Sequence, residues 1–178
     1  MIYRFRIVLD SLEDVFRDIE IKADDTLEDL HNAIVQAFGF EGNEMASFFL
    51  SDDDWNEGEE IMLFDMSEDA ESVRIMNETA IDTVVSKDNT KLIYVYDFLS
   101  MWTFYVELAD IDEEEAGKSY PNLMYSHGNL PDTPPEKKFE SEIDDLDDFD
   151  EDDFYEDGFG DNYINLDDLD DMDPDLWN

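Results

Sequence analysis

The sequence predicts an α+β fold: a mostly antiparallel sheet with one main helix packed on it, followed by an acidic tail. Three observations support this fold class. Two runs near the start alternate apolar and polar residues, as half-buried strands do. One strong amphipathic helix pattern follows them, and two β-rich runs lie further on, between residues 91 and 108. Antiparallel strands with a single packed helix are typical of the α+β class.

The first two expected strands form a hairpin. From Ile2 to Leu9 every second residue is large and apolar on one face, with Arg4 and Arg6 on the other. Val15 to Ile21 alternates in the same way. Because only the polar turn at residues 10–14 separates the two runs, we expect them to pair antiparallel.

The main helix is expected to begin after Thr26. Thr26 and Asp29 have the spacing of a capping box, in which each side chain bonds the backbone of the other residue. Gly39 is a favourable residue just beyond a helix end, since glycine adopts the left-handed conformation without strain. Between these limits apolar residues recur at helical spacing, namely Leu27, Leu30, Ile34 and Phe38. This hairpin-then-helix start is also how a β-grasp fold begins, which is an analogy of topology and says nothing of function.

The later elements have weaker signals. Residues 45–50 and 60–64 are expected to be strands, and residues 77–85 a short helix. The runs at 91–98 and 102–108 are rich in aromatic and β-branched residues, which favour strands. We expect these two runs to form a second hairpin.

The charge is extreme for a chain of 178 residues. There are 52 acidic and 10 basic residues, for a formal net charge of −42. This balance argues against direct binding of nucleic acid and against docking on anionic lipid. No apolar run approaches the roughly 18 residues of a membrane span. Charged residues interrupt the apolar residues near the start, so we expect no signal peptide there. We therefore expect a cytoplasmic protein.

The chain is expected to divide near a proline-rich stretch. Residues 1–130 would form the folded α+β domain, and residues 131–138 a proline-containing linker. Residues 139–178 contain no lysine or arginine. We expect this tail to be either disordered or weakly docked on the domain.

The tail carries apolar and aromatic residues between its carboxylates. Such a mixture stays hydrated and still offers anchors for a partner. The simpler interpretation, a solvating tail without a partner, has about equal weight. The candidate interaction residues are Phe149, Phe154, Tyr155, Phe159, Tyr163, Leu166, Leu169, Leu176 and Trp177.

Catalytic and metal-binding patterns are weak in this sequence. There is no cysteine, and the two histidines, His31 and His127, have no metal-ligand spacing. We therefore expect no metal and no cofactor. His31, inside the predicted helix, is best explained by packing or hydrogen bonding, and His127 is expected in a loop. His31 and Asp97 are the weak catalytic candidates, and on balance we expect no enzyme.

Several stretches together resemble a known family. Asp25-Thr26-Leu27-x-x-Leu30-His31 is followed by Ala37-Phe38-Gly39-Phe40 and later by Tyr94-Val95-Tyr96-Asp97-Phe98 and Trp102. Over residues 2–110 this resembles the plasmid pRiA Orf-three-like family, whose members include passengers of transposable elements. The resemblance implies a compact α+β domain of bacterial or archaeal origin. It implies no established activity.

The chain departs from the family pattern at positions where that pattern is polar. Two histidines of the pattern correspond to Glu44 and Phe104 here, and a Gly-Asp pair corresponds to Leu99-Ser100. Asp97, Trp102 and His31 remain, and Trp102 is expected in the core because large aromatic residues in strands usually pack. These losses favour a role without catalysis.

Three functions compete on this basis. The first is a non-enzymatic protein-interaction module with an acidic tail, whose expected partner is a protein, with a basic protein as one alternative. The second is a nucleic-acid mimic that sequesters basic DNA-associated proteins, since the acidic charge attracts basic surfaces. The third is a divergent enzyme of unknown reaction, which would require His31 and Asp97 to share one pocket. The oligomeric state stays open.

Overall fold

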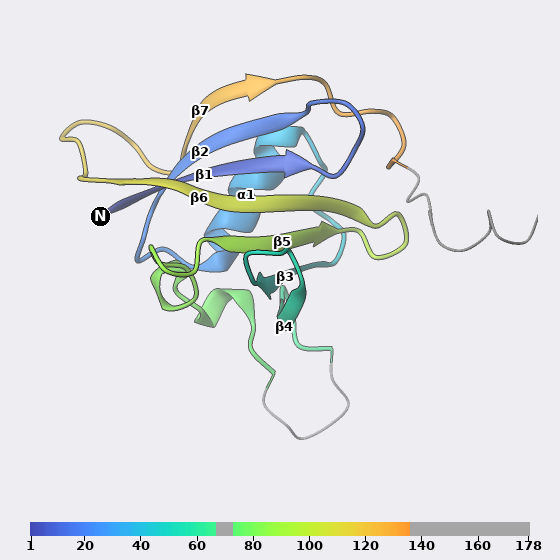
Figure 1. Cartoon of the computed structure of the whole chain (residues 1–178), viewed down its shortest axis with the longest axis horizontal. Helices are drawn as coiled ribbons and strands as arrows, with labels where there is room; N and C mark the ends of the chain where they lie inside the picture. Colours follow the sequence, from blue (N-terminus) through green and yellow to red (C-terminus); the bar gives the residue numbers. More distant parts are fainter. Residues whose placement is uncertain (67–72, 136–178) are drawn as a thin grey trace, which may run out of the picture. The chain divides into compact units, whose positions relative to one another are not determined.

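The computed structural model describes residues 1–66 and 73–135, which form one sheet with a helix behind it (Figure 1). The chain divides into two units, Met1–Glu136 and Lys137–Asn178, and the described residues belong to the first. In chain order the elements are β1 Ile2–Leu9, β2 Phe16–Lys22, α1 Leu27–Phe38, β3 Ala46–Ser51, β4 Glu57–Met62, the 3-10 turns η1 Met76–Glu78 and η2 Ile81–Thr83, β5 Lys91–Tyr96, β6 Trp102–Asp112 and β7 Asn122–His127.

The sheet has seven strands in the order β4-β3-β5-β6-β1-β2-β7, and every neighbouring pair is antiparallel. The α+β class with a mostly antiparallel sheet and one α-helix is thus confirmed for the described residues. The long strand β6 lies at the centre and pairs with β5 on one side and with β1 on the other. Strands β4 and β7 form the two edges.

The alternation in β1 decides which face of the sheet is buried. Tyr3, Phe5, Ile7 and Leu9 lie in the core together with residues of α1. Arg6, on the other face, forms an ion pair with Asp18 of β2. One face of the strand is therefore apolar and packed, and the other carries charge.

Helix α1 begins and ends where its local signals predict. The Thr26 side chain accepts a hydrogen bond from the backbone N–H of Asp29, and the Asp29 carboxylate accepts one from the N–H of Thr26. Gly39 ends the helix with φ 80°, a conformation that favours glycine. The side chains that the helix buries are Leu27, Leu30, His31, Ile34, Val35 and Phe38.

Two expectations about local structure were wrong. Residues 77–85 do not form one helix, because their backbone bonds the chain just before α1: Ile81 donates to Asp25 and Asp82 to Ala23, both at 2.9 Å. Only the two short turns η1 and η2 remain there. His127 is not in a loop but ends β7, where it pairs with Phe16 of β2.

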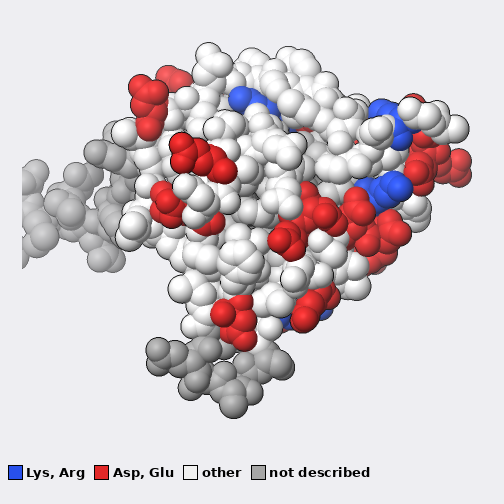
Figure 2. Space-filling model, turned by 180° about the vertical axis from the view of Figure 1, so that it is seen from behind, with Lys and Arg blue, Asp and Glu red and all other residues white. Residues whose placement is uncertain are grey.

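The surface of the described unit is rich in carboxylates. Figure 2 shows acidic side chains in several patches on the face opposite to that seen in Figure 1, with few basic ones, most of them next to acidic groups. In the ranges that the structure covers, no helix has the length and apolar character needed to cross a membrane.

Candidate functional site

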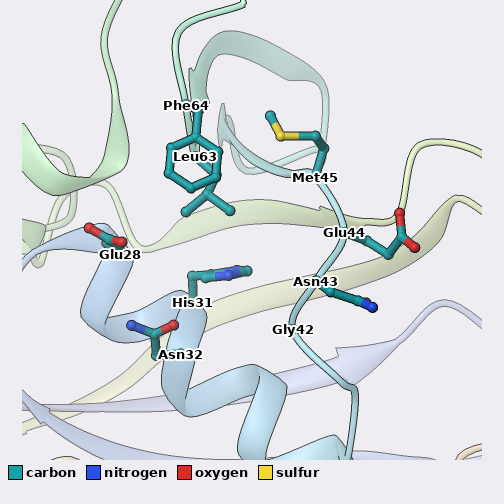
Figure 3. A pocket seen from close by; sticks show the side chains of 9 residues that line it. All are labelled: Glu28, His31, Asn32, Gly42, Asn43, Glu44, Met45, Leu63 and Phe64. Carbon is teal, nitrogen blue, oxygen red and sulfur yellow. The ribbon is translucent and has the colours of Figure 1, made fainter.

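A pocket of about 300 Å³ lies between α1 and two segments next to the β3–β4 edge of the sheet (Figure 3). The chain supplies its lining from three places: the first half of α1, the segment before β3, and the two residues after β4. The lining residues are Glu28, His31, Asn32, Gly42, Asn43, Glu44, Met45, Leu63 and Phe64.

The helix side of the pocket follows from helical spacing. Glu28, His31 and Asn32 are separated by three and four positions, so they lie on neighbouring turns of one face. The capping box at Thr26 fixes where this face begins. Because Leu27 and Leu30 are fully buried in the core, the pocket face of the helix is the adjoining one.

The second wall is held by contacts with strand β5. The N–H of Gly42 donates to the Tyr96 hydroxyl at 3.0 Å, and the Phe40 ring stacks on Tyr96 with 4.4 Å between centroids. Gly42 has φ 79°, and a Cβ there would lie 3.1 Å from Cγ1 of Val35. A residue with a side chain would thus strain this approach to the helix, which supports the choice of glycine.

Leu63 and Phe64 form the apolar wall. The N–H of Leu63 donates to the carbonyl of Ala46 at 3.0 Å, which places this segment beside the start of β3. The Leu63 side chain is buried, but Phe64 is 59 % exposed. An aromatic ring at the edge of a pocket is available to contact an incoming group.

His31 is the most deeply buried polar side chain of the pocket, with 3 % exposure. Its Nδ1 lies 2.7 Å from the hydroxyl of Tyr94, which is itself fully buried. Burial lowers the pKa of His31 from 6.5 to about 4 and raises the pKa of Tyr94 well above its ordinary value. The ring is therefore neutral at pH 7, with one nitrogen bonded to Tyr94 and the other without a hydrogen bond to any described residue.

The pocket joins hydrogen-bond acceptors to an apolar wall. Its lining includes two carboxylates, two side-chain amides and a neutral imidazole, and no lysine or arginine is among the lining residues. Within residues 1–66 and 73–135, no group of three or more His, Cys, Asp or Glu is arranged to hold a metal ion. The histidine is held by the Tyr94 hydroxyl and not by a carboxylate.

The two weak catalytic candidates do not share this pocket. His31 lines it, whereas Asp97 does not. The Asp97 carboxylate accepts hydrogen bonds from the N–H groups of Leu99 and Ser100, within a turn that Asp97 enters with φ 60°. The nine tail residues from Phe149 to Trp177 lie outside the described residues.

The other positions singled out in the sequence have separate locations. Trp102 is 8 % exposed and its ring meets Phe40 edge-on at 5.4 Å, as expected of a core residue. Of the two positions where the family pattern has histidine, Glu44 lines the pocket. Phe104 is fully buried against Phe38.

Sequence reasoning identified only His31 among the pocket residues as a site candidate. The spacing of Glu28, His31 and Asn32 was a usable signal, since it places three polar groups on one helix face. In the segment at 42–45 the signal was the family pattern, which has a histidine at the position of Glu44, and no signal existed for Leu63 and Phe64. Those residues join the site through contacts between segments that are distant in the sequence.

Comparisons with known proteins identify the family. The family model described as plasmid pRiA4b ORF-3-like protein matches residues 1–163, well beyond the residues 2–110 that carried the sequence resemblance. The chain is also similar to a crystal structure of MM3350, a protein of unknown function from Methanosarcina mazei Go1. That match has a TM-score of 0.62 and 20 % identity, and it covers 70 % of this chain and 68 % of the other, which shows a shared fold. No curated protein matches. With nearly its whole length matched by the family model, the chain belongs to the plasmid pRiA4b ORF-3-like family.

Proposed function

We propose that this protein is a non-enzymatic interaction module that binds a basic protein partner through its carboxylate-rich surface. The observation that carries the proposal is the neutralisation of its own cations. Six of the eight basic side chains in the described residues form ion pairs with carboxylates: Arg4, Arg6, Lys22, Arg74, Lys91 and Lys118.

The remaining two cations change this balance little. Arg17 is 8 % exposed, and its guanidinium donates to the carbonyls of Ala37, Phe16 and His127. Lys87, like Arg17, makes no ion pair within the part of the chain that the structure covers. The carboxylates left unpaired thus dominate the exposed charge, and such a surface attracts basic proteins over about 8 Å at physiological ionic strength.

The acidic tail is proposed as a second contact segment. Residues 136–178 hold 20 acidic residues and two lysines, with apolar and aromatic residues among them. Carboxylates give the tail long-range attraction, and its apolar anchors give the contact that persists when salt screens the charge.

The setting of this function is also a proposal. We place it in the bacterial cytoplasm, which the absence of cysteine supports, and in association with mobile elements. The β-grasp-like start remains a proposal about topology, supported by the order β1, β2, α1. An enzyme built on His31 and Asp97 has less support, because Asp97 does not line the pocket.

A pull-down at two salt concentrations tests the proposed function. The full-length protein is immobilised and incubated with bacterial lysate treated with nuclease, beside a polyglutamate support of matched charge. We expect a basic protein that the polyglutamate does not retain, and we expect its capture to fall when salt rises from about 50 to about 500 mM.

A second full-length variant, with the nine tail anchors replaced by serine, separates the two contact segments. If this variant no longer captures the partner at high salt, the binding that resists salt is assigned to the tail. In a further pull-down, DNA is added as a competitor. Loss of the partner when DNA is present would favour the nucleic-acid mimic. Captured proteins with no bias toward basic ones would contradict the proposal.

A further inference from the structure

We propose that the pocket at His31 receives a lysine side chain, and so serves as the anchoring point for one residue of a basic partner. This inference rests on the proposed function, since it names the group that the partner would insert. It commits to a primary ammonium on an aliphatic stem, the chemistry that separates lysine from the other side chains.

The charge of the lining supports an ammonium. Figure 3 shows Glu28 on the helix side and Glu44 on the opposite side, with the His31 ring between them. Asn43 donates its Nδ2 to Glu41 at 3.3 Å, which leaves its Oδ1 as an acceptor. A bound ammonium has three N–H donors and no acceptor, so it matches a pocket that offers mainly acceptors.

His31 supplies the independent observation that this is more than an acidic surface. His31 is 3 % exposed, and of its two ring nitrogens only Nδ1 has a hydrogen-bond partner among the described residues, the Tyr94 hydroxyl. Lysine binding requires the tautomer in which Nδ1–H donates to the Tyr94 hydroxyl, because only then does Nε2 carry a lone pair that accepts a hydrogen bond from a cation in the pocket. Because the ring is uncharged at pH 7, it does not repel a cation.

The apolar part of the pocket fits the stem of lysine. Met45, Leu63 and the exposed Phe64 line one side, and lysine buries its methylene groups on apolar surface while its ammonium meets polar groups. The volume of about 300 Å³ is at the lower end for ligand pockets. It suits one side chain rather than a large cofactor, as in an interface anchored by a few central residues.

Titration with a lysine derivative tests the proposal directly. Nα-acetyl-lysine methylamide is added to the ¹⁵N-labelled full-length protein, and the signals of the Asn32 and Asn43 side-chain amides and of the Gly42 N–H are followed. We expect saturable shifts at these groups. Acetyl-norleucine methylamide, which has the stem without the ammonium, is expected to bind at least about tenfold more weakly.

Two matched variants locate the interaction. Glu44→Gln removes one carboxylate of the pocket and is expected to weaken the lysine probe about tenfold. Glu13→Gln removes the same charge from the β1–β2 turn, and β5 and β6 lie between β1 and β3 in the sheet. This control is expected to bind the probe like the native protein.

The outcomes separate this proposal from the one on which it rests. Equal binding of the norleucine probe, equal loss in both variants, or no shift at the pocket amides would overturn the lysine site, even if a basic partner is captured. Saturable lysine binding without any basic partner in the pull-down would support the pocket and contradict the wider function.

Discussion

Two buried polar centres of this protein differ in how completely they are satisfied. Glu20, on β2, is 2 % exposed and lies on the sheet face away from the core. Its Oε1 accepts from Arg4 at 3.0 Å, and its Oε2 accepts from Lys118 at 2.6 Å and from Asn122 at 3.4 Å. His31, on the helix side, is equally buried but has one partner, Tyr94.

The difference separates a structural group from a candidate binding group. Burial by itself would raise the pKa of Glu20, but hydrogen bonds from Lys118, Arg4 and Asn122 outweigh it, and the pKa lies below its ordinary value. No such compensation exists for His31, whose pKa burial lowers. The second ring nitrogen of His31 has no hydrogen bond to a described residue, and His31 lines a pocket from which a ligand could supply that partner.

Replacing Glu20 should have the largest effect on stability. In Glu20→Gln the buried charge is lost while Arg4 and Lys118 keep theirs, and breaking such a pair costs about 3 kcal/mol of unfolding free energy. Chemical denaturation followed by circular dichroism measures this loss. Asp112→Asn is the control, since Asp112 contacts the same guanidinium at 2.7 Å but is 48 % exposed; it should cost less than about 1 kcal/mol. Equal costs in the two variants would remove the structural role assigned to Glu20.

The next largest expected effect is a loss of unfolding free energy at acidic pH, caused by His31. Its pKa is lower in the folded protein, about 4 against 6.5, so the unfolded chain takes up the proton first as pH falls. The contribution of neutral His31 to the unfolding free energy is complete above pH 6.5 and is lost as pH falls toward 4. At pH 4.5 the loss is about 2 kcal/mol.

The many carboxylates also titrate in this range, so the measurement is a difference. Unfolding free energies of the native protein and of His31→Gln are compared at pH 7 and pH 4.5. The advantage of the native protein should shrink by about 2 kcal/mol as pH falls. A difference that stays constant between the two values would show that His31 is not held neutral by burial.

A smaller effect is expected from the partner of His31. Tyr94→Phe removes the hydroxyl that bonds Nδ1, and this should cost about 1 kcal/mol. Tyr3→Phe is a matched control, because the Tyr3 hydroxyl bonds the buried carbonyl of Val85 at 3.2 Å, away from the pocket lining. Both variants should lose similar stability in thermal unfolding, but only Tyr94→Phe should weaken the lysine probe. If the lysine probe binds more weakly to both variants, a general loss of packing, and not the orientation of His31, affects the pocket.

The parts of the fold that were predictable depend on neighbours in the sequence. The alternation of β1 and the capping box at Thr26 are encoded within a few residues, and both lie where the sequence predicts them. Strand β7 was missed because all but one of its residues are exposed, so it shows no burial pattern. The turns at residues 76–83 depend on backbone bonds to the start of α1, which no local pattern contains.

The same reasoning explains how little of the pocket was predictable. His31 could be identified as a polar residue inside the predicted helix, one position after the core residue Leu30. Its relation to Glu44 depends on Gly42 bonding Tyr96, and its relation to Leu63 on the pairing next to Ala46. These contacts arise only when the sheet assembles.

The most direct test compares the two centres in one experiment. Nα-acetyl-lysine methylamide is titrated into Glu20→Gln and Glu44→Gln, and the unfolding free energy of each variant is measured in the same buffer. Glu20→Gln should lose about 3 kcal/mol of stability and bind the probe normally, whereas Glu44→Gln should keep its stability within about 0.5 kcal/mol and bind about tenfold more weakly. Native affinity in Glu44→Gln would contradict the assignment of the His31 pocket as the binding centre.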